Sequence, residues 1–366
     1  MSQRFVTRLA KPEDAPGLME LLADTPQQGS IQLNFERQPN YFIAAAIGTQ
    51  VPELFIYEDQ EQHRVAGAGS IGRREVYING ELKSIRYSSD LRIHRDYQGG
   101  RALLRMFKSL REELGDDWYQ TVILEENEAS LATVGSGRLK VQPTYYPAGQ
   151  FRTNMIDLKR KEKHTIKHHI RRATHADVQA MQGFFNAEAK EKQFYPHYEF
   201  DQIGSENPYY KDIKLEDMFL AFKNDTLVGM TGLWDQKQFK QTRVTGYSRS
   251  MEMARPLYNI YTRIMGGLAL PPAGSLLSYI SLHTTVVKNN DSDIFADLLA
   301  QVRRELYGSS YQALVVGFDL KDPLQKITDQ YKKVELFSRH FLGSYGDDPM
   351  NELDRDRIMY LETARL

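Results

Sequence analysis

The chain contains no cysteine among its 366 residues. Without a thiol it can form no disulfide, no thiolate nucleophile and no cysteine-ligated zinc or iron–sulfur centre. The P-loop pattern G-x-x-x-x-G-K-[S/T] is absent as well, and we expect no Rossmann-type dinucleotide site. These absences exclude thiol catalysis and P-loop nucleotide binding, and they fit a reducing compartment.

Neither sign of charge dominates, and no apolar run is long. The 47 Lys and Arg residues are balanced by 48 Asp and Glu residues, so the overall charge predicts no nucleic-acid or membrane partner. The most apolar run, Tyr41 to Ile47, is too short to span a bilayer, and the first ten residues have no apolar core for export. We therefore expect a cytoplasmic protein, and the sequence leaves a homodimer open.

The chain is long enough for two domains, and it repeats itself. Arg8, Ala10 and Asp14 near the start correspond to Arg171, Ala173 and Asp177. Apolar positions at helical spacing follow both segments, namely Leu18, Leu21 and Leu22 in the first and Met181, Phe184 and Phe185 in the second. A second match, Val65–Gly67 with Leu227–Gly229, follows at nearly the same offset. We expect a duplicated α/β unit, with domains at residues 1–160 and 165–366.

A glycine pair in the first copy stands between an expected strand and an expected helix. The strand begins at Tyr87 and leads through Gly99-Gly100 into a helix with a periodic apolar face. The N-terminus of a helix after a tight glycine turn binds anions, because free N–H groups and the helix dipole both favour negative charge. Three arginines nearby are further cationic donors or solvated surface residues: Arg95, Arg101 and Arg105.

The order strand, helix, two paired strands, central strand and glycine loop resembles the GNAT superfamily of acyl-CoA-dependent N-acyltransferases. The resemblance implies an α/β fold of two GNAT-like domains, each a mostly antiparallel mixed sheet flanked by helices. It also implies direct acyl transfer to an amine of unknown identity, with acetyl-CoA or another short acyl-CoA as co-substrate. The alternative is an inactive module that senses acyl-CoA or binds a protein.

The family's pyrophosphate loop, (Arg/Gln)-x-x-Gly-x-(Gly/Ala), is matched only in part. Gly100 and Ala102 fit its second half, which puts Tyr97 where Arg or Gln is usual. Alternatively, Gln98 takes the polar position and Arg101 replaces a glycine. The resemblance implies that the following residues contact coenzyme A: Leu91, Arg92, Ile93, Tyr97, Gln98, Gly99, Gly100, Arg101, Ala102 and Asn127.

The acid and the base of the reaction have several candidates. The family often places a tyrosine acid seven residues after the asparagine, but this chain has Val134 there. Tyr145 and Tyr146 are the candidates in its place, or they pack in a loop. A base must deprotonate the acceptor ammonium, and the candidates are Asp90, Glu125 and Glu126, each of which could also be an ordinary surface acid. The resemblance places the donor to the thioester carbonyl near Ile93, and His94 is a candidate proton shuttle.

The second copy lacks the glycine loop. Its equivalent strand, 276–287, leads into Lys288–Asp293, where carboxylates at the helix start cap N–H groups and repel phosphate. We therefore expect coenzyme A to bind the first copy alone and no metal to bind. The aromatic segments Phe194–Tyr198 and Asn207–Tyr210 are expected to line an acceptor site or to pack against their own sheet. The basic run 159–172 is expected to be a solvated linker.

Overall fold

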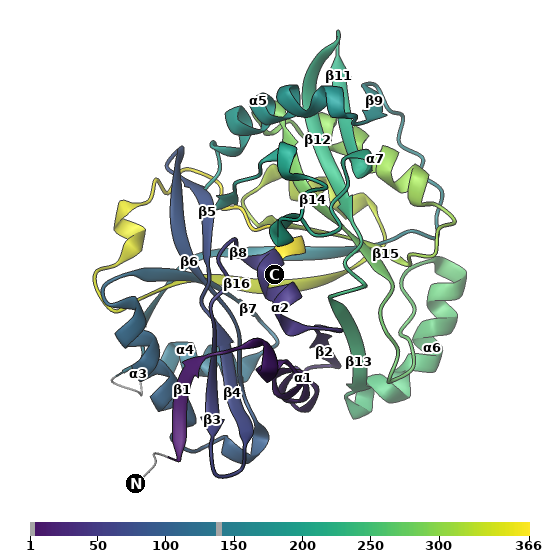
Figure 1. Ribbon diagram of the computed structural model, residues 1–366. Helices are drawn as coiled ribbons and strands as arrows, with labels where there is room; N and C mark the ends of the chain where they lie inside the picture. Colours follow the sequence, from purple (N-terminus) through teal and green to yellow (C-terminus); the bar gives the residue numbers. More distant parts are fainter. Residues whose placement is uncertain (1–3, 137–140) are drawn as a thin grey trace.

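The computed structural model describes residues 4–136 and 141–366 (Figure 1). Within these ranges no helix is long and apolar enough to cross a membrane. The strands of the first half are β1 (Phe5–Leu9), β2 (Ile31–Glu36), β3 (Leu54–Asp59), β4 (Arg64–Ser70), β5 (Arg73–Ile78), β6 (Glu81–Ile93), β7 (Trp118–Leu124) and β8 (Thr144–Asp157). Its helices are α1 (Ala15–Asp24), α2 (Tyr41–Gly48), α3 (Ala102–Leu114) and α4 (Glu128–Ser136).

The second half follows from residue 169 onward. Its strands are β9 (His169–Arg172), β10 (Tyr195–Pro196), β11 (Met218–Lys223), β12 (Thr226–Trp234), β13 (Gln241–Tyr247), β14 (Tyr279–Val287), β15 (Ala313–Asp319) and β16 (Lys333–Ser344). Its helices are α5 (Val178–Ala189), α6 (Arg249–Met265) and α7 (Ser292–Leu306).

The two halves repeat one strand order. The first runs β1-β3-β4-β6-β7 and the second β9-β11-β12-β14-β15. In both, the last two strands are parallel and the other neighbours are antiparallel. A mixed α/β sheet flanked by helices, as the sequence predicts, is therefore confirmed.

The matching residues of the repeat form the same ion pair in each half. Arg8 Nη1 lies 2.7 Å from Asp14 Oδ2, and Arg171 Nη2 lies 2.6 Å from Asp177 Oδ1. Each aspartate also accepts a backbone N–H from the residue three positions before it, at 2.7 and 2.8 Å. The aspartate thus fixes the turn between the first strand and the first helix, which explains why the sequence shows the repeat at this point.

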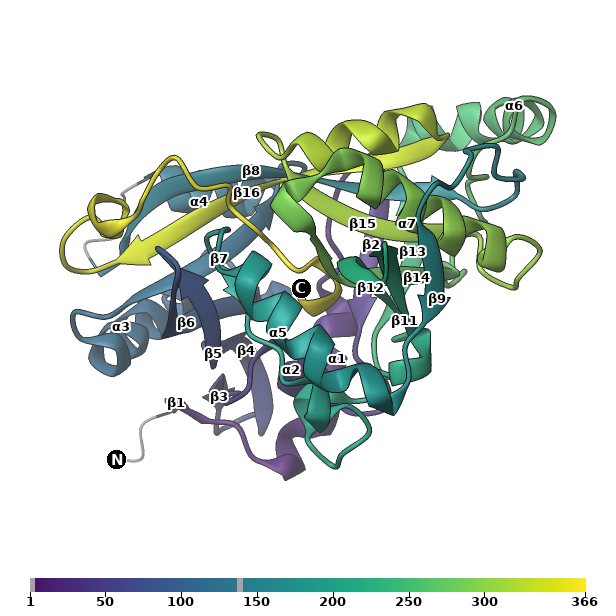
Figure 2. The same ribbon diagram turned by 90° about the horizontal axis from the view of Figure 1, so that it is seen from above.

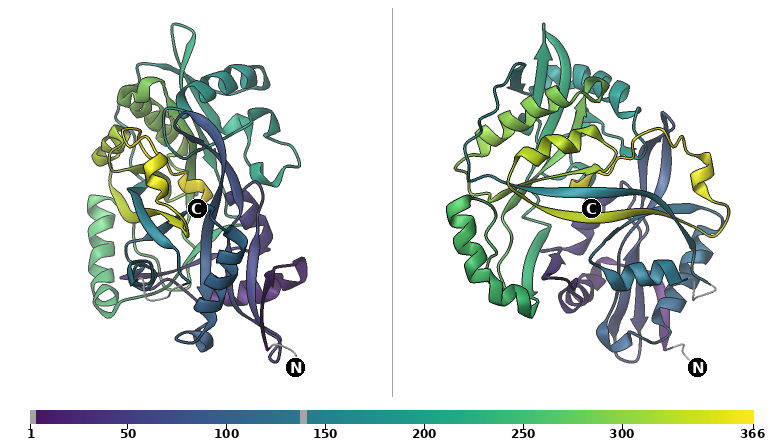
Figure 3. Two further views of the ribbon diagram at one scale, coloured as in Figure 1. Left: turned by 90° about the vertical axis from the view of Figure 1, so that its left-hand side faces the viewer. Right: turned by 180° about the vertical axis from the view of Figure 1, so that it is seen from behind.

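The last strand of each half pairs with the other half. β8 lies between β15 and β16, and β16 lies between β8 and β7. Figures 2 and 3 show β8 and β16 side by side as they run from one half into the other. This exchange joins both halves into one sheet of 14 strands, so neither half completes its sheet with its own last strand.

A separate two-stranded sheet also joins the halves. β2 pairs with β13 in antiparallel register from Ile31–Tyr247 to Glu36–Gln241. Arg243 Nη2 of β13 donates to Glu36 Oε2 of β2 at 3.0 Å. The sequence gives no sign of this contact, because both strands are short and their pairing spans more than 200 residues of chain.

The segment Gly67–Gly72 has the spacing G-x-G-x-x-G that Rossmann-type proteins use for dinucleotides. It begins inside β4 and leads into β5 rather than into a helix. A phosphate loop of that type requires a strand followed directly by a helix N-terminus. The spacing therefore marks no dinucleotide site here.

The linker between the halves is expected from the sequence to be solvated along its length, and this expectation is only partly met. Its lysines are exposed, but Glu162 is buried in an ion pair with Arg303 of α7. His164 Nε2 and His168 Nδ1 contact the carboxylate of Asp297 at 2.6 and 2.8 Å. Alternate side chains of the run therefore fasten it to α7, which composition alone could not indicate.

Candidate active site

A bulge in β6 opens the sheet in the first half. The pairing of β6 with β4 shifts register between Ala68 and Ser70, and Asp90 has a φ of 53° inside the irregular stretch. The parallel pairing of β6 with β7 ends at Ser88–Thr121, although both strands continue. The two strands therefore diverge, and within residues 4–136 and 141–366 the side of β6 that faces β7 has no strand partner beyond Ser88.

A cavity of about 570 Å³ lies at this divergence. Its walls come from β6, β7, α3 and α4 of the first half and from β13, β14 and β15 of the second. Seven of the predicted site residues line it: Asp90, Leu91, Arg92, Ile93, Gln98, Asn127 and Tyr145. The sequence thus indicates much of the first-half wall, and the contribution of the second half comes from the fold.

The glycine loop lies next to the cavity. Gln98 and Leu103 on either side of it line the cavity, whereas Tyr97 and Gly99–Ala102 are not part of the described lining. Gln98 Nε2 donates to the carbonyl of Ile93 at 2.9 Å and closes the turn. Gly99 follows with a φ of 74°, a conformation that suits glycine. A Cβ at Gly99 would touch nothing within 4 Å, whereas a Cβ at Gly100 would lie 3.3 Å from the carbonyl oxygen of Tyr97. Ala102 then begins α3, whose first N–H groups have no partner within the helix.

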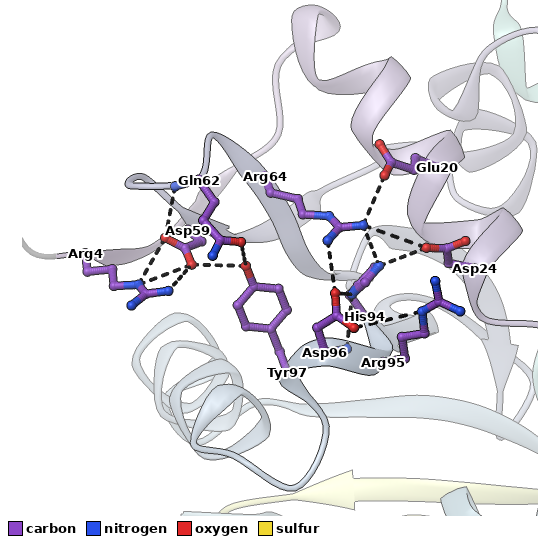
Figure 4. Close-up of polar contacts among 10 residues, drawn as sticks. All are labelled: Arg4, Glu20, Asp24, Asp59, Gln62, Arg64, His94, Arg95, Asp96 and Tyr97. Carbon is purple, nitrogen blue, oxygen red and sulfur yellow. Dashed lines mark hydrogen bonds and ion pairs between the residues drawn. The ribbon is translucent and has the colours of Figure 1, made fainter.

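The turn before the glycines is held by polar contacts to neighbouring elements (Figure 4). The Tyr97 hydroxyl donates to Asp59 Oδ2 at 3.0 Å. His94 is 1% exposed, and its Nε2 lies 2.8 Å from Asp24 Oδ2. Arg64 contacts Asp96 at 3.1 Å on the other side of the turn. These contacts fix the loop in place. The Tyr97 hydroxyl and the His94 ring are thus bonded to neighbouring parts of the protein.

Asp90 carries a negative charge into the cavity. It accepts hydrogen bonds from Tyr41 Oη at 3.1 Å and from Arg37 Nη2 at 3.3 Å. Burial alone would raise the pKa of Asp90, but the charges of Arg37 and Arg92 and the Tyr41 hydrogen bond hold that pKa below its usual value. Asp90 is therefore ionised at neutral pH, which suits binding of an ammonium group better than removal of its proton.

Lys240 is a cavity residue that the sequence does not indicate. Part of its side chain faces the cavity, and its Nζ lies 3.4 Å from the carbonyl oxygen of Ala364. Desolvation by the surrounding protein, aided by the charge of Arg37 and opposed by that of Asp90, lowers the pKa of Lys240 to about 7. A lysine in a polar loop gives no sequence signal of this kind, because the residues that perturb it come from both halves.

The remaining predicted groups lie in three places. Tyr145 lines the cavity, its Oη accepts from the Tyr119 hydroxyl at 2.8 Å, and burial raises the pKa of Tyr145 to about 12. Tyr146 packs against an apolar cluster outside the cavity lining. Glu125 accepts from Gln150 at 2.6 Å and pairs with Arg339 at 3.1 Å, while Glu126 is exposed. Neither glutamate belongs to the described lining of the cavity.

Comparison with solved structures identifies the fold. N-myristoyltransferase from Saccharomyces cerevisiae with bound myristoyl-CoA aligns with a TM-score of 0.61 at 8% identity, over 98% of this chain and 84% of that one. A GCN5-related N-acetyltransferase from Sphaerobacter thermophilus aligns with a TM-score of 0.55 at 14% identity, over 95% and 98%. The chain has the GNAT fold. A probable N-acyltransferase from Enterococcus faecalis V583 is also similar, with a TM-score of 0.52 at 7% identity over 93% and 72%. No protein-family model and no curated protein matches the sequence.

The second GNAT half has the same bulge but fills the opening. Thr284 has a φ of 51° next to the register shift between β12 and β14. Its backbone N–H donates to Glu362 Oε2 at 2.8 Å, and the short helix at Thr363–Arg365 packs on β14 and β15. Part of the chain therefore occupies the gap that remains open in the first half.

The loop of the second GNAT half is built without glycine. Asn289 and Asn290 take the left-handed conformation in its place, with φ values of 53° and 52°. Asp291 caps α7 by accepting the N–H of Asp293 at 2.8 Å. A carboxylate thus already occupies the helix N-terminus where a phosphate would have to bind.

The two aromatic segments lie in the core rather than in the cavity wall. Phe194, Tyr195 and Tyr198 are at most 1% exposed, and Tyr209 and Tyr210 at most 4%. Tyr195 pairs with Tyr77 of β5, and Arg365 stacks on Tyr209 with its guanidinium 3.5 Å from the ring centre. None of the residues in either segment is part of the described cavity lining, so their packing joins the halves.

Proposed function

We propose that the protein is an N-acyltransferase that transfers an acetyl or other short acyl group from coenzyme A to an amine. The observation that carries the proposal is the cavity at the divergence of β6 and β7, next to the glycine loop and the start of α3. A thioester that enters this gap would meet unpaired backbone groups of β6 near Ile93. Its pyrophosphate would meet the N–H groups at Gly99–Ala102.

The side chains of the cavity can share the work of direct transfer. Ionised Asp90 would bind the acceptor ammonium, and neutral Lys240 would take its proton. The amine nitrogen then attacks the thioester carbonyl carbon, and the carbon–sulfur bond breaks as the amide forms. The nitrogen gives up its second proton to water in this step, and water later returns a proton to Tyr145. Tyr145, whose raised pKa keeps its hydroxyl protonated, would protonate the departing thiolate.

The acceptor would enter against the second half of the chain. Thr242, Tyr279 and Ser281 line the cavity opposite the first-half strands, and Thr242 Oγ1 lies 3.0 Å from Tyr279 Oη. These groups offer hydrogen bonds to a polar amine. The second half thus supplies part of the acceptor site in this proposal, and its own closed cleft has no catalytic role.

The test is release of coenzyme A from acetyl-CoA, and from longer acyl-CoAs, in the presence of a panel of amines. The panel includes polyamines, amino acids, aminoglycosides and peptides with a free N-terminus or lysine. Amine-dependent release that Asp90→Asn weakens supports the proposal. Tight acyl-CoA binding with no release for any amine would support the alternative, a module that senses acyl-CoA. The replacement of the family tyrosine by Val134 is the observation that favours this alternative.

A further inference from the structure

Helix α6 shows the reverse of the usual amphipathic arrangement. Its apolar side chains face the solvent, with Met253 82% exposed, Leu257 74% and Ile264 73%. Ile260 and Tyr261, also exposed, complete a stripe at helical spacing. A helix at the surface of a globular protein ordinarily turns such a stripe toward the core. We call this surface the α6 face.

The side of α6 that faces the protein carries polar groups that bind to neighbouring segments. Thr262 is 6% exposed, and the amide of Asn259 both donates to and accepts from the backbone of Leu270, at 2.9 and 2.8 Å. Arg255 covers the ring of Tyr247 at 5.5 Å. These contacts fix the rotation of the helix, so the apolar stripe is held outward by specific hydrogen bonds. Figures 1 and 3 show α6 at the outer edge of the second half.

Basic side chains lie beside the α6 face. Arg249 and Arg263 are exposed on the helix, and the linker brings Arg160 to its C-terminal end, where Arg160 Nη2 donates to the carbonyl of Met265. Lys159, Lys161 and Lys163 are exposed neighbours of Arg160 in the linker, and Lys161 Nζ lies 5.8 Å from the ring centre of Tyr307. Within the described residues, none of these six cations forms an ion pair. Glu252 is the one acidic residue of α6, and it pairs with Arg255 at 3.1 Å.

We propose that the α6 face docks on an anionic lipid surface, with its apolar stripe in the interface and its basic margin on the headgroups. An amphipathic helix with exposed large apolar side chains and flanking arginines has the features of an interfacial helix. The neutral total charge of the chain conceals this local excess of positive charge. A second copy of the chain is the less favoured occupant, because two such basic margins would repel each other across a symmetric interface.

The proposal is tested by flotation with vesicles. The full chain is mixed with vesicles of phosphatidylcholine alone or of phosphatidylcholine and phosphatidylglycerol in equal parts. Wild type should float with the mixed vesicles and much less with the neutral ones. The double variant Leu257→Ser/Ile264→Ser should lose at least roughly tenfold in apparent affinity. Arg249→Gln/Arg263→Gln should bind more weakly at low salt and show a smaller salt dependence than wild type.

The control is Leu9→Ser/Leu82→Ser, which changes two exposed leucines of the first half, 54% and 43% exposed; it should float like wild type. Thermal unfolding of every variant shows that the fold is intact. Equal binding of wild type and the α6 double variant would overturn the proposal, and so would failure of wild type to bind the mixed vesicles. Sedimentation velocity adds a further test: a wild-type dimer that Leu257→Ser/Ile264→Ser converts to a monomer would assign the face to a second copy instead.

Discussion

Asp90 and Thr284 occupy the same position in the two halves, each with a positive φ beside the bulge that opens its sheet. Asp90 lines the open cavity of the first half. The backbone N–H of Thr284 is bonded to Glu362, and the C-terminal segment packs in the equivalent gap. The same bulge thus borders an open cavity in one half and is covered by the C-terminal segment in the other.

Replacement of Asp90 by Asn should weaken acceptor binding more than turnover. The variant keeps an acceptor for the Tyr41 hydrogen bond but removes the charge that would hold the ammonium, and it leaves Arg37 without its counter-charge. We expect KM for the amine to rise roughly tenfold or more, with little change in KM for acyl-CoA. Steady-state kinetics with each substrate varied in turn measures both constants. The matched variant is Asp96→Asn, which touches the loop outside the cavity; an equal effect of the two variants would contradict a role for Asp90 in the site.

Lys240 should set the pH dependence of turnover. Its pKa is lowered to about 7, so it is mostly protonated below that pH and mostly neutral above it. The rate at saturating substrates should therefore rise as the pH passes through about 7. Lys240→Met should lower the rate above pH 7 by roughly tenfold to a hundredfold, and the rise near pH 7 should disappear. Lys237→Met, at an exposed position in the same loop, should keep the wild-type profile; an unchanged profile in Lys240→Met would remove Lys240 from the mechanism.

The sequence predicts the repeat, the strand order and the first-half wall of the cavity, because local signals encode them. Arg8 and Asp14 are six residues apart and determine a turn, and the adjacent Gly99 and Gly100 determine a loop. Both signals lie within a short stretch of chain. It does not predict the exchange of β8 and β16 or the pairing of β2 with β13, since these contacts depend on which distant strand completes each sheet. Arg37 and Lys240 escape prediction for the same reason: their electrostatic partners come from other parts of the fold.

The strand exchange predicts that the first half cannot fold alone. In a chain that ends after Lys163, β8 would lose both neighbours, β15 and β16, and β7 would lose β16. Unpaired strands of this length favour aggregation over a stable sheet. Circular dichroism during heating should show no cooperative unfolding for this fragment.

The matched experiment is expression of residues 1–163 together with residues 164–366. The two pieces should assemble, because each supplies the strand that the other needs. A fragment 1–163 that unfolds cooperatively and binds acetyl-CoA by itself would contradict the dependence on exchanged strands.

Acyl-CoA should bind the first half, on the glycine loop, and nowhere else on the chain. Calorimetric titration of acetyl-CoA tests it with wild type, Gly100→Ala, Gly100→Asp and Asp291→Ala. Alanine and aspartate at position 100 both place a Cβ 3.3 Å from Tyr97 O. The difference in acetyl-CoA affinity between these two variants therefore measures the effect of the carboxylate, which would repel the pyrophosphate. We predict one site per chain in wild type and Asp291→Ala, weaker binding in Gly100→Ala and none in Gly100→Asp. Two sites per chain, or wild-type affinity in Gly100→Asp, would contradict binding at the glycine loop alone.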